Sequence, residues 1–205
     1  MSRPRIYLIE DDAAVRDALQ MVLAETGHQV EAFAAADTFL QYGHARRPGC
    51  LILDLRLPRM SGIELLQLLA REGRHLPTIV ISAHGDIPTA VHSMQLGAID
   101  FLQKPFDNEV LLERIHRCLT HEMARFKIIE ARDLCRRQLA VLSNRERQIL
   151  DLTANGLLNK QIAYELSISP RTVEVHRANI RQKLGVSHSS ELVRIALLAR
   201  DDLTD

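Results

Sequence analysis

Five short, mostly apolar segments set the strongest constraint on how this 205-residue chain can fold. They occupy residues 6–9, 29–33, 50–53, 78–81 and 99–102, and apolar residues recur at helical spacing in stretches between them. Three of the segments are apolar throughout, which is typical of strands that helices cover on both faces. Alternating strands and helices predict βαβ units. We therefore expect an α/β domain with a doubly wound, five-stranded parallel sheet of the flavodoxin-like class.

The stretch from Phe106 to Asn155 contains neither glycine nor proline. It must hold the last helix of the first domain, a connector and the first helix of a second domain. Its apolar residues follow a roughly heptad spacing: Leu112, Ile115, Leu119, Phe126 and Ile129. One interpretation is a long linking helix that could pair with a second copy of the chain. The other is a helix that ends near Thr120, followed by an irregular polar linker.

The last third of the chain has the signals of four short helices. Ser143 and Glu146 form a capping-box pattern, and Gly185 marks the end of a later helix that opens at Pro170. We expect a first domain at 1–120, a linker that is helical in one interpretation at 121–139, and an all-α four-helix domain at 140–205. The net charge is −3 over residues 1–120 and +3 over 121–205, which favours a nucleic-acid role for the second part.

Polar residues stand where the predicted strands end. Glu10 and Asp11 follow the first strand, Asp54 the third, Ser82 the fourth, and Lys104 comes after the fifth. The carboxyl ends of parallel strands line one crevice, so these residues should converge there. Clustered carboxylates without histidine or cysteine suit Mg²⁺, while a lysine and a hydroxyl suit a phosphoryl group. Asp54 is the best candidate for a nucleophile that forms an acyl phosphate.

The first part resembles the receiver domain of bacterial two-component response regulators. The matching segments are Ile9–Asp12, Leu53–Gly62, Ile81–Asp86 and Asp100–Phe106. The resemblance implies phosphorylation at Asp54, with Mg²⁺ held by Glu10, Asp11, Asp54 and the backbone carbonyl of Arg56. It also implies a switch made of Ser82, Phe101 and Lys104, and a cis peptide before Pro105. By position, Asp12 begins the first helix, where an acid caps the N-terminus.

The second part has the pattern of a helix-turn-helix, in which a helix from about Pro170 to Leu184 would enter the major groove of DNA. The segments Leu142–Leu150, Asn159–Ala163 and Ser169–Ile180 resemble the LuxR-type DNA-binding domain. The resemblance implies base-facing positions at Glu174, Val175 and Ala178. It implies contacts with the DNA backbone from Lys160, Arg171, Thr172, His176, Arg177 and Lys183.

Together the two parts resemble FixJ-type regulators of the NarL/FixJ family, including the segment His84–Pro88, where we expect His84 to be a loop histidine. This implies a response regulator that a sensor histidine kinase phosphorylates, and that then dimerises and binds double-stranded promoter DNA to regulate transcription. RNA polymerase is a further candidate partner. No apolar run reaches the roughly 18 residues of a membrane span, and we expect a bacterial cytoplasmic protein that does not contact the membrane.

Two alternatives come from other classes of function. The chain could be a Mg²⁺-dependent phosphatase or hydrolase that uses the same aspartyl-phosphate chemistry. Against this, no second acid is placed to activate a leaving group, and the basic second part would have no role. It could instead bind DNA constitutively and carry an inactive receiver, although the presence of Asp54, Ser82 and Lys104 argues against that.

Overall fold

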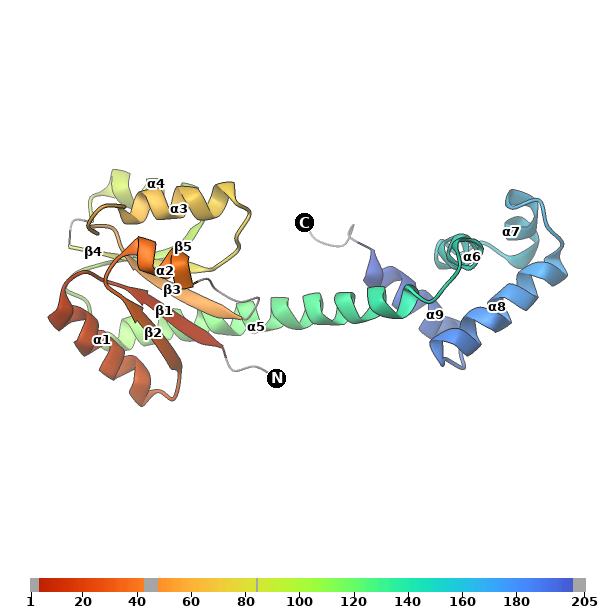
Figure 1. The fold of residues 1–205 in the computed structure, drawn as a ribbon, viewed down its shortest axis with the longest axis horizontal. Helices are drawn as coiled ribbons and strands as arrows, with labels where there is room; N and C mark the ends of the chain where they lie inside the picture. The colour runs from red at the N-terminus through yellow and green to blue at the C-terminus, as the bar shows by residue number, and fades with distance from the viewer. Residues whose placement is uncertain (1–3, 43–47, 84, 201–205) are drawn as a thin grey trace. The chain divides into compact units, whose positions relative to one another are not determined.

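The computed structural model describes residues 4–42, 48–83 and 85–200, and its backbone contacts divide the chain into two units (Figure 1). The first unit comprises residues 1–126 and the second residues 127–205. Within the described part of the chain, no helix is both long and apolar enough to span a membrane. His84, expected to be a loop histidine, lies outside the described residues.

A five-stranded parallel sheet forms the centre of the first unit. Its strands are β1 (Arg5–Ile9), β2 (Gln29–Phe33), β3 (Gly49–Asp54), β4 (Thr78–Ser82) and β5 (Ala98–Gln103). Their spatial order is β2-β1-β3-β4-β5, which is the doubly wound, flavodoxin-like order. All five predicted strands are therefore confirmed, within one or two residues at their ends. The register places Asp54 beside Ile81, and Ser82 beside Gln103.

Helices cover both faces of this sheet. They are α1 (Ala13–Glu25), α2 (Ala36–Tyr42), α3 (Gly62–Arg71), α4 (Ile87–Gln95) and α5 (Asn108–Leu139). Figure 1 shows α1 and α5 on one face and α3 and α4 on the other. The strand side chains alternate between two cores, so that Ile6 packs with α1 and α5 whereas Tyr7 packs with α2 and α3. The central strands are apolar throughout because both of their faces are buried.

Helix α5 runs without interruption from Asn108 to Leu139. The alternative of a helix that ends near Thr120 before an irregular linker is therefore wrong. Part of the predicted heptad seam has a role inside the first unit, because Ile115 and Leu119 are buried in its core and Leu112 packs against them. These residues recur at helical spacing because they cover the sheet, so they are not available for pairing with a second copy.

The second unit contains α6 (Asn144–Ala154), α7 (Asn159–Glu165), α8 (Pro170–Leu184) and α9 (Ser189–Ala199), as expected for four short helices. The Ser143 hydroxyl accepts a hydrogen bond from the Glu146 backbone, and the Glu146 carboxylate accepts one from the Ser143 backbone, which completes the capping box. Gly185 ends α8 with a φ of 65°, a left-handed conformation that glycine adopts without steric cost. A small apolar core joins these helices.

Candidate functional site

The strand ends bring together the polar residues that the sequence singled out. Glu10 follows β1, Asp54 ends β3, Ser82 ends β4 and Lys104 follows β5. The backbone N–H of Lys104 donates a hydrogen bond to the carbonyl of Ser82, with 2.8 Å between the nitrogen and the oxygen. Residues that lie 94 positions apart in the sequence thus meet at one edge of the sheet, where ligands of open α/β sheets bind.

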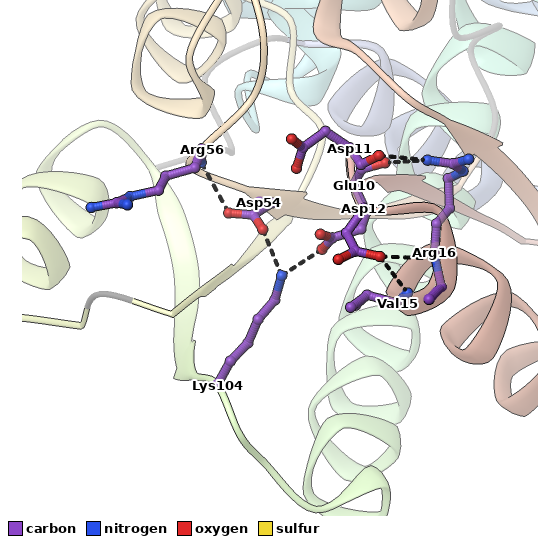
Figure 2. A network of polar contacts seen from close by, with 9 residues as sticks. Glu10, Asp11, Asp12, Val15, Arg16, Asp54, Arg56 and Lys104 are labelled. Carbon is purple, nitrogen blue, oxygen red and sulfur yellow. Dashed lines mark hydrogen bonds and ion pairs between the residues drawn. The ribbon is translucent and has the colours of Figure 1, made fainter.

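Lys104 is the centre of this cluster (Figure 2). Its Nζ lies 2.6 Å from Oε2 of Glu10 and 2.5 Å from Oδ2 of Asp54. Burial alone would lower the pKa of Lys104, but the hydrogen bonds with Asp54 and Glu10 outweigh this effect and raise it. Burial raises the pKa of Glu10, and the nearby Asp54 charge adds to this, while Lys104 opposes it. The ammonium therefore holds two buried carboxylates together.

The donor set at this edge fits a hard divalent cation. Carboxylate oxygens of Glu10, Asp11 and Asp54 all lie within 4.8 Å of one another. Glu10 and Asp54 are buried, whereas Asp11 is exposed and leaves one side of the group open to solvent. Three carboxylates around a single lysine leave a net negative charge, and oxygen donors with space for water suit Mg²⁺. These residues are the ones that would hold the ion.

Two backbone interactions fix the carboxylates in place, and sequence reasoning did not find the first. The Arg16 guanidinium donates hydrogen bonds to the backbone carbonyls of Glu10 and Asp11, at 2.8 and 3.1 Å (Figure 2). Its sequence signal is weak, because the position of a single arginine on a helix does not show which carbonyl groups it binds. The backbone N–H of Arg56 donates to Oδ1 of Asp54 at 2.9 Å, so this segment does lie beside Asp54.

Asp12 lies next to the acidic pair but serves the helix. Its carboxylate accepts hydrogen bonds from the backbone N–H groups of Ala14 and Val15, which confirms it as the N-cap of α1. The peptide bond between Lys104 and Pro105 is cis, as the resemblance implied.

Gly62 allows the loop after Asp54 to pack against it. A Cβ atom at this position would lie 2.4 Å from the backbone oxygen of Asp54 and 2.8 Å from the Cα of Leu55, which is too close for any other residue. The backbone N–H of Gly62 also donates to the carbonyl of Leu55 at 3.0 Å. This close approach explains why the segment that contains the aspartate also needs the glycine eight residues later.

The two remaining switch candidates lie on β4 and β5. Ser82 is buried at the end of β4. Phe101 is half-buried in the middle of β5 and packs against the core that α2 and α3 cover. Both therefore lie on neighbouring strands next to α4, because α4 follows β4 in the chain and contacts β5.

Helix α8 is the structural counterpart of the predicted groove helix. Val173 and Ile180 are buried in the core of the second unit, and Glu174, Val175 and Ala178 are exposed on another side of the helix. Arg171 is also exposed, and Thr172 joins the Ser169 cap, with 2.8 Å between the two hydroxyl oxygens. Lys160, in the first turn of α7, is exposed and His176 is half-buried.

Two basic residues of α8 interact within the domain. Nζ of Lys183 donates to Oε2 of the buried Glu146 at 2.8 Å, and Arg177 donates to Oδ1 of Asn159 at 2.6 Å and to the Ser189 hydroxyl at 3.3 Å. The hydrogen bond from Lys183, followed by the one from the Ser143 backbone, lowers the pKa of Glu146 to about 2. These cations thus stabilise the domain itself, which the sequence did not indicate.

Comparison with protein families identifies both units. Residues 6–116 match the response regulator receiver domain, and residues 140–196 match the luxR family of bacterial regulatory proteins. The chain therefore belongs to the family of response regulators that combine a receiver domain with a LuxR-type DNA-binding domain. It is a two-component transcription regulator, as the motifs predicted.

The relatives define the type more narrowly. The chain is 44% identical over 194 residues to the transcriptional regulatory protein FixJ of Azorhizobium caulinodans, covering 95% of this chain and 92% of the relative. It is 41% identical over 198 residues to the response regulator TodT of Pseudomonas putida, covering 97% and 87%. The resemblance to FixJ-type regulators is thereby confirmed. Because these relatives are transcription regulators, the interpretation as a phosphatase or hydrolase is not supported.

Solved structures agree with this assignment. The response regulator StyR has a TM-score of 0.83 and 43% identity, with 96% of this chain and 99% of that chain covered. Full-length FixJ from B. japonicum has a TM-score of 0.57 and 39% identity, with 97% and 98% covered.

Proposed function

We propose that Asp54 is the residue that accepts a phosphoryl group from a sensor histidine kinase. The observation that carries this proposal is the contact of one ammonium, Lys104 Nζ, with the carboxylates of both Asp54 and Glu10 at the edge of a parallel sheet. In the transfer, an oxygen of Asp54 forms a bond to phosphorus as the bond between phosphorus and the kinase histidine nitrogen breaks.

The surrounding residues have separate tasks in this proposal. Glu10, Asp11, Asp54 and the Arg56 carbonyl would hold Mg²⁺, which when bound offsets the charge of the incoming phosphate. The Arg56 backbone N–H restrains Oδ1 of Asp54 and leaves Oδ2 facing Lys104. After transfer, the Lys104 ammonium and the Ser82 hydroxyl bind phosphate oxygens, because the new group adds about two negative charges and several acceptors.

The change at Ser82 is then transmitted to the surface of α4 and β5. We propose that Phe101 turns inward when the Ser82 segment moves towards the phosphate, and that this selects between two pre-existing states. The surface concerned exposes an apolar stripe on α4, formed by Ile87, Val91 and Met94, whose exposed fractions are 78%, 49% and 47%. A stripe of this kind is suited to burial against a second copy of the chain, which supports a homodimer in the phosphorylated state.

The dimer would bind double-stranded promoter DNA through α8 of each copy. We propose domain limits of 1–120 and 140–205, with a linker at 121–139. Base edges would meet Glu174, Val175 and Ala178. The DNA backbone would meet Lys160, Arg171, Thr172 and His176. Arg177 and Lys183 would contribute more weakly to backbone binding because of their contacts within the domain. We further propose RNA polymerase as a partner and the bacterial cytoplasm as the location, because a regulator that binds promoter DNA would meet the polymerase there.

The decisive experiment combines labelling with DNA binding. Full-length protein incubated with acetyl phosphate and Mg²⁺ should gain one phosphoryl group, mapped to Asp54, and its affinity for promoter DNA should rise. Asp54→Asn should show neither change, while Asp12→Asn, which alters the neighbouring N-cap, should still be phosphorylated. Equal labelling of Asp54→Asn at another residue would refute the assignment. DNA affinity that does not respond to phosphorylation would favour a constitutive DNA-binding protein.

A further inference from the structure

The exposed face of α8 continues beyond the residues that the sequence marked as base-facing. Six of its exposed residues recur at helical spacing on one face: Arg171, Glu174, Val175, Ala178, Asn179 and Gln182. The buried residues Val173 and Ile180 lie on another side of the helix. Asn179 follows Val175 by four positions, so the two side chains lie near each other on the same exposed surface.

The hydrogen bonds of the domain separate the polar residues of α8 into two groups. Arg177 and Lys183 are bound to Asn159, Ser189 and Glu146. Within residues 4–42, 48–83 and 85–200, by contrast, the side-chain amide of Asn179 has no hydrogen-bond partner. Its donor and its acceptor are therefore both available to a ligand that approaches this face.

We propose that Asn179 reads an adenine in the major groove, an inference that rests on the proposed DNA-binding function. The amide would donate from Nδ2 to N7 of adenine and accept at Oδ1 from the N6 amino group, the bidentate pairing that asparagine makes with this base. Ala178 beside it carries only a methyl group, which allows the helix backbone to come close to the bases.

Helix geometry places this adenine relative to the other contacts. The four residues from Val175 to Asn179 rise about 6 Å along the helix. Stacked bases are about 3.4 Å apart along a strand, so the adenine lies about two base pairs from the pair that Val175 meets. The Val175 side chain, which is 53% exposed, suits a thymine methyl group, and the Glu174 carboxylate suits the N4 amino group of cytosine.

The test uses the full chain, phosphorylated with acetyl phosphate and Mg²⁺, in a selection from randomised DNA duplexes. Wild type should select an adenine at one position of each half-site. Asn179→Ala should lose that preference by about tenfold or more while the other selected positions stay unchanged. The matched variant Gln182→Ala, on the same exposed face, should keep it. Both changes replace exposed residues with a better helix former, so circular dichroism should show an intact fold.

A chemical probe then identifies the atom that is read. Replacing the selected adenine by 7-deazaadenine removes N7 and keeps Watson–Crick pairing. This should weaken binding of wild type and leave binding of Asn179→Ala unaffected. An adenine preference that persists in Asn179→Ala, or an equal loss of affinity on all sequences, would overturn the proposal. If wild type shows no sequence preference at all, it is the proposed DNA-binding function that fails.

Discussion

Removing the Lys104 charge should destabilise the receiver domain through repulsion between Glu10 and Asp54. The side chains of these two residues are 1% and 8% exposed, and their oxygens lie within 4.8 Å of each other. At that separation and an effective dielectric constant of 20, two unit charges repel by about 3.5 kcal/mol. Because water can enter beside the exposed Asp11, we expect Lys104→Met to lower the free energy of unfolding by about 2–3 kcal/mol at pH 7.

A double-mutant cycle isolates this repulsion. Urea unfolding of full-length wild type, Lys104→Met, Asp54→Asn and the double variant should be followed by circular dichroism in EDTA. Asparagine at position 54 removes one of the two negative charges, so Lys104→Met should cost only about 1 kcal/mol in that background. If the effects of the two substitutions simply add, Lys104 does not act by separating the carboxylates, and our interpretation of the cluster is wrong.

The pH dependence provides a second check on the same variant. The pKa of Glu10 is raised in the folded protein, chiefly by burial, so the ionised form of this residue disfavours folding. The contribution of Glu10 to the free energy of unfolding is therefore greatest below pH 4.5, which is its pKa in the unfolded chain. This contribution is lost as the pH rises through the higher pKa of Glu10 in the folded protein. Without Lys104 the pKa of Glu10 should rise further. The loss in the free energy of unfolding caused by Lys104→Met should thus be full at pH 7 and shrink as the pH falls towards 4.5. Adding Mg²⁺ at pH 7 should also reduce this loss.

Three further predictions concern other parts of the chain. Lys183→Met should lower the free energy of unfolding of the DNA-binding domain by about 1 kcal/mol at pH 7, a modest loss because the ion pair with Glu146 is partly exposed. In urea unfolding, this loss should fade as the pH falls from 4.5 to about 2, where Glu146 becomes protonated. Arg171→Gln should weaken binding to all DNA sequences and lower the salt slope by about 1, measured by fluorescence anisotropy across salt concentrations. Gly62→Ala should lower the free energy of unfolding by about 2 kcal/mol or more in urea, because its methyl group would meet the Asp54 carbonyl.

The sequence predicted the strands and the strand-end cluster because both follow from local patterns. Apolar runs that stop at polar residues mark strands of a parallel sheet, and the carboxyl ends of such strands share one edge. The cap at Ser143 and the stop at Gly185 are also local signals, and both are confirmed.

Contacts between distant residues had no such signal. Arg16 holds the Glu10 carbonyl from the next helix, and Lys183 binds Glu146 across 37 residues. A basic residue on a helix has the same pattern whether it faces solvent, DNA or a buried acid, so periodicity does not separate these cases. The heptad spacing in α5 was ambiguous for a similar reason, because Ile115 would face a sheet and a partner helix with the same period.

The internal contacts of Arg177 and Lys183 also affect how the protein would search a chromosome. Each protein cation that pairs with a DNA phosphate releases a counterion from the DNA and prolongs every encounter with the wrong sequence. Lys183 is already paired with the Glu146 carboxylate, and Arg177, although still charged, is held by Asn159 and Ser189. Both should therefore add less to nonspecific binding, and a single copy should leave random DNA sooner. In the dimer proposed above, two copies on paired half-sites would lengthen residence, so the time spent at a promoter would depend on that dimer more than on the concentration of monomer.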